Sequence, residues 1–267
     1  FEESIAEDSF NKLEKGVYVF MNENNFNKFL MIIKSAGFIR PWMIRSKNAI
    51  NFAYILYLKL RELGYDQTLI ESYVRRWFVM SVITSKYSGS PESTIDYDIR
   101  NIVEKTFPDY YKIIEDGILS DAYWNVTLVN DLATSVSSAP VFHAYLASQV
   151  KGNDKGFLSK EITVNHLISN TGDVHHIFPK NYLKKNGLRR SQYNQIANYV
   201  YMQSEINIRV SDKPPKIYFG ELKDQALNGG LKYGGIQTME ELTDNLEVNC
   251  IPFEIFEMDI DDYSDFL

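Results

Sequence analysis

The stretch TGDVHHIFPK, residues 171–180, places two of the chain's four histidines side by side and ends in a proline turn. Residues 173–177 are few enough for one β-strand, and the proline that follows has no amide proton with which to continue it. The stretch NYVYM, residues 198–202, is rich in aromatic and β-branched residues, which predicts a second strand. Residues 203–212 have helical character and precede the pair Pro214–Pro215, which cannot continue a helix. The predicted order is therefore strand, loop, strand and helix, with both histidines on the first strand.

The rest of the chain is expected to be mainly helical. Its 267 residues are 45% hydrophobic and 14% aromatic, which is typical of a folded globular protein. Apolar residues recur at helical spacing over much of the first 150 residues. The predicted helices run from Asn24 or Asn25 to before Gly37, from Ala49 to Leu63, from Asp66 to Thr84, from a start at Ser90 and Pro91, from Ser120 to about Leu132 and from Ala139 to about Val150. The predicted fold class is α+β, predominantly α-helical.

Two domains are expected. The stretch KGNDKGF, residues 151–157, is rich in Gly, Asn and charged residues, as linkers are. Residues 1–150 are therefore predicted to form a helical domain. Residues 151–267 are predicted to form a second domain, in which the small strand–strand–helix motif packs on helices. The chain begins with Phe1 rather than Met, which indicates a piece of a longer protein.

The net charge of −7 is unevenly distributed. Residues 240–267 contain ten acidic residues and no Lys or Arg, and the remaining residues carry +3. Residues 175–216 contain eight basic residues and two acidic ones, so the histidine pair lies in a positive local field that suits a polyanionic ligand. The alternative for the basic region is a solvated loop. The acidic region is expected to be a solvated terminus, and the alternative is a segment that shields or mimics phosphates.

No targeting or membrane segment is visible. There is no secretory signal, and no uncharged apolar run approaches the ~18 residues that cross a bilayer. Cys250 is the chain's single cysteine, which excludes an internal disulfide and a Cys-x-x-Cys zinc site. A cytoplasmic protein without membrane contact is expected, and no oligomeric state is indicated.

The polar residues of the motif follow a particular spacing. His175-His176-Ile-Phe-Pro is followed by Asn198 and, nine positions later, by Asn207, while Asp173 lies two positions before the pair. This arrangement resembles the HNH nucleases, also called His-Me finger or ββα-metal nucleases. Four longer stretches, KYSGSPESTIDYDI, GDVHHIFPKNYL, YNQIANYVYMQSEINI and SDKPPKIYF, resemble the C-terminal half of GmrSD-type restriction proteins, prokaryotic defence proteins that attack modified foreign DNA. That resemblance implies a ParB-like, nucleotide-hydrolysing N-terminal domain, which is not in this sequence.

The resemblance implies a metal-dependent endonuclease that hydrolyses phosphodiester bonds in DNA. His176 is the expected general base, because a histidine with a pKa near ~6.5 is available in its neutral form at cellular pH. His175 and Asn207 are expected to hold the cation, and Asn198 to hydrogen-bond the loop backbone and orient His176. One imidazole and one amide oxygen suit Mg²⁺ or Mn²⁺ with several waters better than a structural Zn²⁺.

Basic side chains near the motif are expected to contact the flanking DNA phosphates: Arg209, Lys213 and Lys180. Two other functions are open. The domain could be a catalytically inactive nuclease fold that binds DNA or a partner, or its helical first half could relay the nucleotide state of the N-terminal domain. Two neighbouring histidines without the asparagines would indicate only a structural role, as is predicted for His143 and His166.

Overall fold

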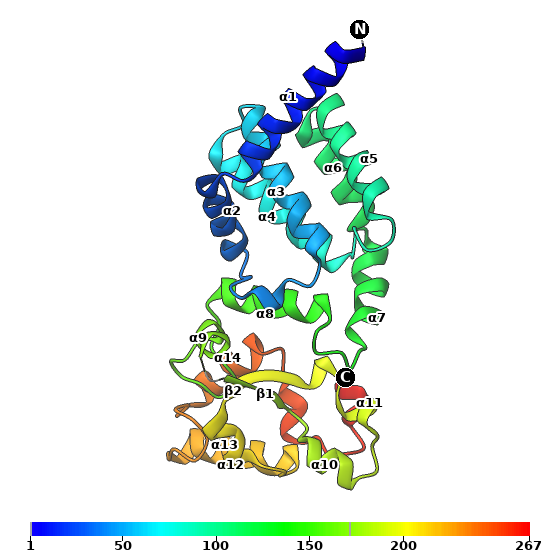
Figure 1. Ribbon diagram of the computed structural model, residues 1–267. Coiled ribbons are helices and arrows are strands. Elements are labelled where there is room, and N and C mark those ends of the chain that lie inside the picture. Colours follow the sequence, from blue (N-terminus) through cyan, green and yellow to red (C-terminus); the bar gives the residue numbers. More distant parts are fainter. Residues whose placement is uncertain (1, 171) are drawn as a thin grey trace. The chain divides into compact units, whose positions relative to one another are not determined.

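The computed structural model describes residues 2–170 and 172–267, and the chain divides into two compact units (Figure 1). The first unit ends at Asp121, and the second runs from Ala122 to Leu267. Helices dominate, and the strands of the described residues form one two-stranded antiparallel sheet. The predicted class, α+β with a predominance of helix, is confirmed at this level.

The first unit is helical, and its helices begin and end at residues suited to those places. Asp66 caps α4 by accepting the N–H of Thr68 at 2.8 Å, and Gly64, with φ at +79°, follows the end of α3. The start of α2 was predicted two or three residues too late, because Asn22 is the residue that caps it. The elements are α1 (Glu2–Phe20), α2 (Glu23–Ser35), η1 (Pro41–Met43), α3 (Lys47–Glu62), α4 (Gln67–Ile83), α5 (Pro91–Glu104) and α6 (Phe107–Ile118).

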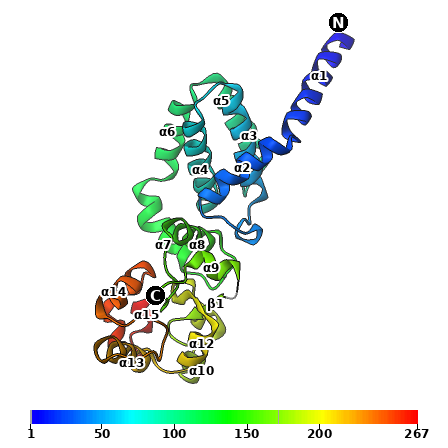
Figure 2. The ribbon, with the colours of Figure 1, turned by 90° about the vertical axis from the view of Figure 1, so that its left-hand side faces the viewer.

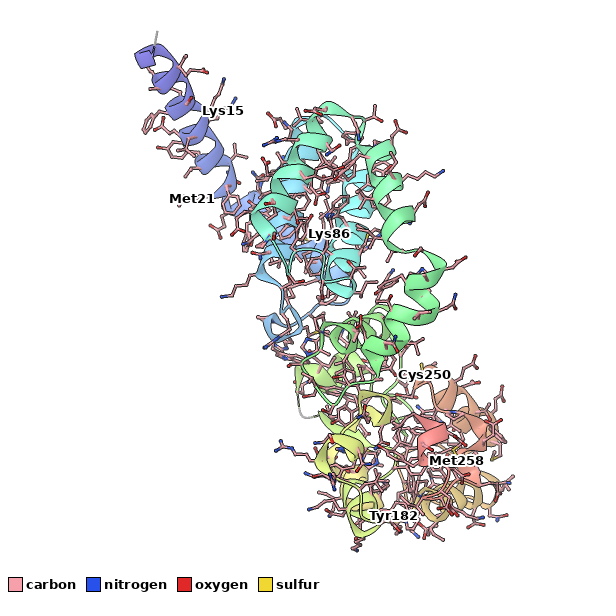
Figure 3. The ribbon with its side chains drawn as sticks, turned by 90° about the vertical axis from the view of Figure 1, so that its right-hand side faces the viewer. Lys15, Met21, Lys86, Tyr182, Cys250 and Met258 are labelled. Atoms are coloured by element: carbon pink, nitrogen blue, oxygen red, sulfur yellow. The ribbon has the colours of Figure 1, made fainter. Side chains whose placement is uncertain are left out.

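A charged residue is buried in the core of the first unit. The carboxylate of Asp98 is fully buried and accepts hydrogen bonds from the hydroxyls of Tyr87 and Tyr110. Its charge is matched by Lys86, whose Nζ lies 3.2 Å from Asp98 Oδ2 among the helices (Figure 3). The indole of Trp77 donates to the Tyr87 hydroxyl at 3.0 Å. This cluster joins the end of α4 to α5 and α6, and every atom named has a partner.

The second unit contains the sheet, with helices on both sides. Figures 1 and 2 agree in placing α8 and α9 on one side of the strands and α12 and α13 on the other. The elements are η2 (Tyr123–Thr127), a π-helical turn, α7 (Leu128–Leu132), α8 (Pro140–Gly152), α9 (Val164–Ser169), β1 (Gly172–His176), α10 (Lys180–Lys185), α11 (Arg190–Tyr193), η3 (Ile196–Asn198), β2 (Tyr199–Gln203), α12 (Ser204–Val210), α13 (Pro215–Asn228), α14 (Met239–Val248), η4 (Phe253–Phe256) and α15 (Tyr263–Phe266).

The predicted order of strand, loop, strand and helix is confirmed. β1 and β2 pair antiparallel, with His175 opposite Val200 and His176 opposite Tyr199, and α12 follows β2 directly. The connection between the strands was predicted as a polar, basic loop. It instead contains α10 and α11, whose Leu183 and Tyr193 are buried and tie the connection to the core.

The second unit begins about 30 residues before the expected boundary at residues 150 and 151. The reason is that α8 is bound into this unit: Gln149 Nε2 donates to the carbonyl of Val248 at 3.2 Å. The predicted linker, residues 151–157, also contributes to the core. Phe157 is fully buried, and its N–H donates to the carbonyl of Tyr201 in β2 at 2.8 Å.

The acidic segment, residues 240–267, was expected to be a solvated terminus, and that prediction was wrong. It contains α14, η4 and α15, and its apolar residues belong to the core of the second unit. Leu242, Leu246 and Ile255 are each no more than 2% exposed. Acidic and apolar residues alternate at helical spacing, so the acidic side chains can face water while the same helices complete the core.

Candidate functional site

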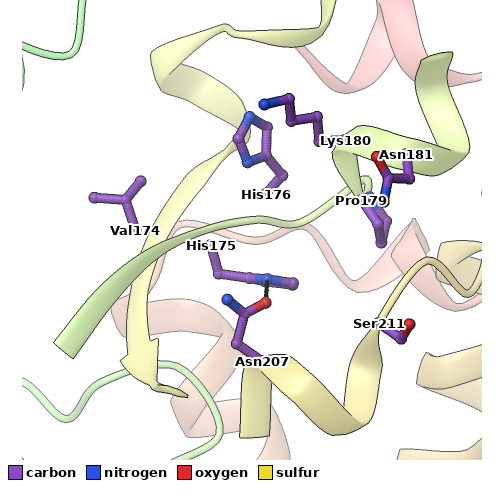
Figure 4. A pocket seen from close by; sticks show the side chains of 8 residues that line it. All are labelled: Val174, His175, His176, Pro179, Lys180, Asn181, Asn207 and Ser211. Atoms are coloured by element: carbon purple, nitrogen blue, oxygen red, sulfur yellow. Dashed lines mark hydrogen bonds between the residues drawn. The ribbon is translucent and has the colours of Figure 1, made fainter. Parts of the chain in front are cut away.

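The two neighbouring histidines lie at the end of β1 and point to opposite sides of it (Figure 4). Adjacent strand residues must do so. His175 points towards α12, where its Nδ1 lies 2.6 Å from Oδ1 of Asn207. His176 points the other way and lies beside Lys180 of α10. Both rings nevertheless line one pocket, because the strand ends at His176.

His175 is held as a neutral ring. It is 3% exposed, and its ring stacks on Phe157 with the planes 16° apart. Burial lowers the pKa of His175 to about 4; its hydrogen bond with Asn207 opposes the shift, and His176 adds to it. The ring is therefore neutral at cellular pH, the form in which histidine binds metal ions.

One nitrogen of His175 has no protein partner. The Oδ1 of Asn207 can only accept, so Nδ1 carries the ring proton and Nε2 keeps a lone pair. That Nε2 is buried and unbonded within the described part of the chain. Ser81 Oγ and Asn249 Oδ1 share this condition. What distinguishes His175 is that it also lines a pocket.

His176 is more accessible and is fixed by a second asparagine. Its Nε2 lies 3.0 Å from Oδ1 of Asn194, which follows α11, and its ring meets Tyr199 edge-on at 4.9 Å. Burial lowers the pKa of His176 below its usual value; the hydrogen bond with Asn194 opposes this shift, and the charge of Lys180 adds to it.

Asn198 holds the turn that follows the histidines. It is fully buried; its Oδ1 accepts the N–H of Phe178 at 2.7 Å, and its Nδ2 donates to the Phe178 carbonyl at 3.1 Å. Its own carbonyl accepts the N–H of Ile177 at 2.9 Å. These are the backbone hydrogen bonds expected of Asn198. The side chain that hydrogen-bonds the His176 ring directly is that of Asn194 instead.

The pocket has a volume of about 320 Å³. Four of its residues were not anticipated from the sequence as site residues, although the motif itself was. Its lining is Val174, His175, His176, Pro179, Lys180, Asn181, Asn207 and Ser211 (Figure 4). Ser211 ends α12 with a backbone φ of +55°, which is unusual for a residue other than Gly.

The three basic residues expected at DNA phosphates are placed differently from one another. Lys180 lines the pocket and is exposed. Arg209 is exposed but donates to the carbonyls of Leu231 and Lys232, both at 3.2 Å. Lys213 forms an ion pair with Glu221 at 2.8 Å and a hydrogen bond with Tyr233. The structure thus brings only Lys180 to the histidines and engages the other two elsewhere.

The available ligands suit a hard divalent cation that keeps some of its water better than a cation held by protein side chains alone. Within residues 2–170 and 172–267, no three His, Cys, Asp or Glu side chains gather in a way that could hold a metal ion. The side chain of Asp173 lies outside the described residues. Nδ1 of His175 and Oδ1 of Asn207 lie 2.6 Å apart, so the two could share one Mg²⁺ or Mn²⁺ if the ring proton moved from Nδ1 to Nε2, with water and phosphate oxygens as the other ligands.

Comparisons with known proteins give one distant relative. No family model and no solved structure matches the chain. The chain is similar to an uncharacterized protein, MJ0686, of Methanocaldococcus jannaschii, with 24% identity over 187 residues. This region covers 69% of the chain and 31% of the relative, so the chain spans about a third of that protein's length. Among the helices described, none is both long and apolar enough to cross a membrane.

Proposed function

We propose that this chain is a metal-dependent DNA endonuclease of the HNH type, which hydrolyses phosphodiester bonds in prokaryotic defence against foreign DNA. In this proposal β1, β2 and α12 form the ββα-metal motif. The substrate class and the defence role come from the resemblance to GmrSD-type proteins. The chemistry rests on the side chains at the end of β1.

One observation carries the proposal. Asn207 and His175 are 32 positions apart in the sequence, yet Nδ1 of His175 and Oδ1 of Asn207 lie 2.6 Å apart. The pair lines a pocket that also contains His176, a third polar group with a different orientation and a different partner. A structural hydrogen bond would explain the first contact alone. It would not explain why the buried imidazole of a residue that lines a pocket keeps one nitrogen unbonded.

The proposed roles follow from what each side chain can do. With the ring proton on Nε2, Nδ1 of His175 and Oδ1 of Asn207 would hold Mg²⁺ or Mn²⁺, which, when bound, stabilises charge on the scissile phosphate and the leaving oxygen. His176 would take a proton from the attacking water, because its lowered pKa keeps the ring neutral at cellular pH. Asn198 would hold the turn after the histidines so that both rings stay in place.

We assign the phosphate contacts to α10 and α11. Lys180 and Arg190 are exposed, and neither is engaged by an acidic side chain among the ion pairs of the described residues. Lys180 lines the pocket. Tyr199 lies opposite His176 in the sheet; burial raises the pKa of Tyr199, and the nearby positive charge of Arg190 opposes that shift. Arg209 and Lys213 are less suitable, because both would have to give up protein partners.

A cleavage assay tests the proposal. The full chain should nick or cut plasmid DNA with Mg²⁺ or Mn²⁺ but not with EDTA, and His176→Ala should reduce the rate by about 10²–10⁴-fold. The matched control is His166→Ala, since His166 is exposed and lies in α9. Equal melting temperatures would show that both variants are folded. Cleavage by His176→Ala at the wild-type rate would disprove the proposal, as would DNA binding without metal-dependent cleavage.

A further inference from the structure

The ring of His176 has only one hydrogen-bonding side chain that fixes its orientation in the described structure, and that side chain is Asn194. A neutral imidazole carries its proton on either nitrogen, and the two forms differ in which nitrogen can accept a proton from water. Because the amide oxygen of Asn194 accepts at 3.0 Å from Nε2, the proton is held on Nε2. The lone pair is then on Nδ1, the nitrogen nearer the backbone.

Asn194 needs an anchor, because the element before it is short. α11 has four residues, too few to be stable without tertiary contacts. The hydroxyl of Tyr263 supplies them: it donates to the carbonyl of Gln192 at 3.0 Å and lies 3.5 Å from that of Tyr193. Tyr263 belongs to α15 and lies 71 residues after Gln192 in the sequence. The C-terminus lies beside α11 in Figure 1.

Tyr263 also contacts the other side of the histidine turn. It is 4% exposed, and its ring packs against Phe178 with centroids 5.1 Å apart. Burial raises the pKa of Tyr263, which keeps the hydroxyl protonated as a donor, while a hydrogen bond with Asn198 opposes the shift. One side chain therefore meets the turn after His176, the asparagine that holds that turn, and the two residues before Asn194.

We propose that Asn194 is the positioning residue that sets the tautomer and orientation of the His176 ring, and that Tyr263 of the acidic C-terminal segment holds Asn194 in place. The proposal rests on the proposed function, in which His176 is the base. In this proposal the acidic segment, through Tyr263, helps to position the general base. Asn194 does not touch the substrate and acts only through His176.

Two pairs of variants test this. Asn194→Leu removes the acceptor at similar size, whereas Asn194→Asp keeps it. Tyr263→Phe removes one hydroxyl and keeps the ring, with Tyr97→Phe as control, since Tyr97 is 57% exposed in the first unit. We expect kcat for DNA cleavage to fall about 10–100-fold in Asn194→Leu and several-fold in Tyr263→Phe, with KM unchanged. Tyr97→Phe should stay within about threefold of wild type, and Asn194→Asp, which keeps the acceptor, should recover part of the rate that Asn194→Leu loses.

A second readout does not depend on activity. In ¹⁵N-histidine NMR of the full chain, with the His176 signals assigned by their loss in His176→Ala, Nε2 should be protonated and Nδ1 unprotonated. Asn194→Leu should shift both signals towards a mixture of tautomers, and Tyr263→Phe should do so partly. Unchanged signals in Asn194→Leu would overturn the inference. If the signals shift while the wild-type chain cleaves no DNA, the positioning by Asn194 stands and the proposed function fails.

Discussion

The two units each bury a polar cluster, and the clusters differ in one respect. Around Asp98 in the first unit, both carboxylate oxygens are bonded, the charge is matched by Lys86, and the tyrosine hydroxyls are engaged. Around His175 in the second unit, one nitrogen is bonded to Asn207 and the other, which is buried, to nothing in the described chain, and the residue lines a pocket. A saturated cluster, in which every polar atom has a hydrogen-bond partner, stabilises a fold. An unsaturated cluster, in which one polar atom lacks a partner, can still bind a ligand when it lines a pocket.

The largest effect on stability is expected in the saturated cluster. Asp98→Asn removes the charge opposite Lys86, whose side chain is 9% exposed, and should lower the free energy of unfolding by about 3–5 kcal/mol. The matched control is Asp96→Asn, because the Asp96–Arg100 pair is exposed and worth about 0.5 kcal/mol. Urea denaturation of both variants measures the difference. If Asp98→Asn were as stable as wild type, the cluster would not hold the first unit together.

For the cluster around His175 we expect the opposite balance, with a smaller loss of stability and a larger loss of cleavage activity. Asn207→Leu leaves Nδ1 of His175 without its acceptor, which should cost about 1–3 kcal/mol of stability. It also removes one of two proposed metal ligands, so cleavage in Mg²⁺ should fall at least about 100-fold. Asn207→Asp, which keeps an oxygen ligand, should retain cleavage. A folded Asn207→Leu chain that cleaves DNA normally would make this cluster as structural as the one around Asp98.

A smaller effect is expected for the basic residues. Lys180→Ala and Arg190→Ala should each weaken DNA binding several-fold and reduce the slope of log affinity against log salt by about 1. Lys213→Ala should leave that slope unchanged, because Lys213 already pairs with Glu221. Fluorescence anisotropy in EDTA, over a range of salt concentrations, separates binding from cleavage. A loss of slope in Lys213→Ala alone would place the DNA over α13 rather than α10 and α11.

The smallest effect concerns a third cluster, at the surface of the second unit. Burial would raise the pKa of Glu221, but hydrogen bonds from Lys213, Lys232 and Tyr233 lower it to about 2. A carboxylate with a depressed folded-state pKa stabilises the protein above its unfolded value of 4.5, and this contribution is lost as pH falls towards 2. Glu221→Gln should therefore cost about 1 kcal/mol or less at pH 7, and nothing near pH 2. Equal losses at both pH values would show that packing rather than charge is responsible.

The motif could be read from the sequence because it is local. β1, β2 and α12 lie within residues 172–210, and α12 follows β2 directly, so strand patterns and prolines were enough to predict the order. Asn194 carried no such signal: it is one of several asparagines in a polar connection. Its importance depends on Tyr263, whose contact with Gln192 arises only when the C-terminal segment folds back.

The domain boundary and the acidic segment were mispredicted for a related physical reason. Composition indicated a linker at residues 151–157 and a solvated terminus at residues 240–267. The first contains one large apolar residue, Phe157, and the second contains several, and these decide the outcome. Phe157 and Leu242 are fully buried, and the charged residues around them tolerate the fold because they lie at its surface. Average composition over a window does not reveal which few side chains enter a core.

The most direct test concerns the divalent cation that His175 and Asn207 are proposed to share. Crystals of the full chain soaked in Mn²⁺ should give an anomalous peak between the His175 ring and the Asn207 amide oxygen, with His176 outside the coordination sphere and water completing it. The same soak of Asn207→Leu should lose the peak. A chain that cleaves DNA with Mn²⁺ but binds the ion elsewhere, or that shows no peak at this pair, would contradict the account.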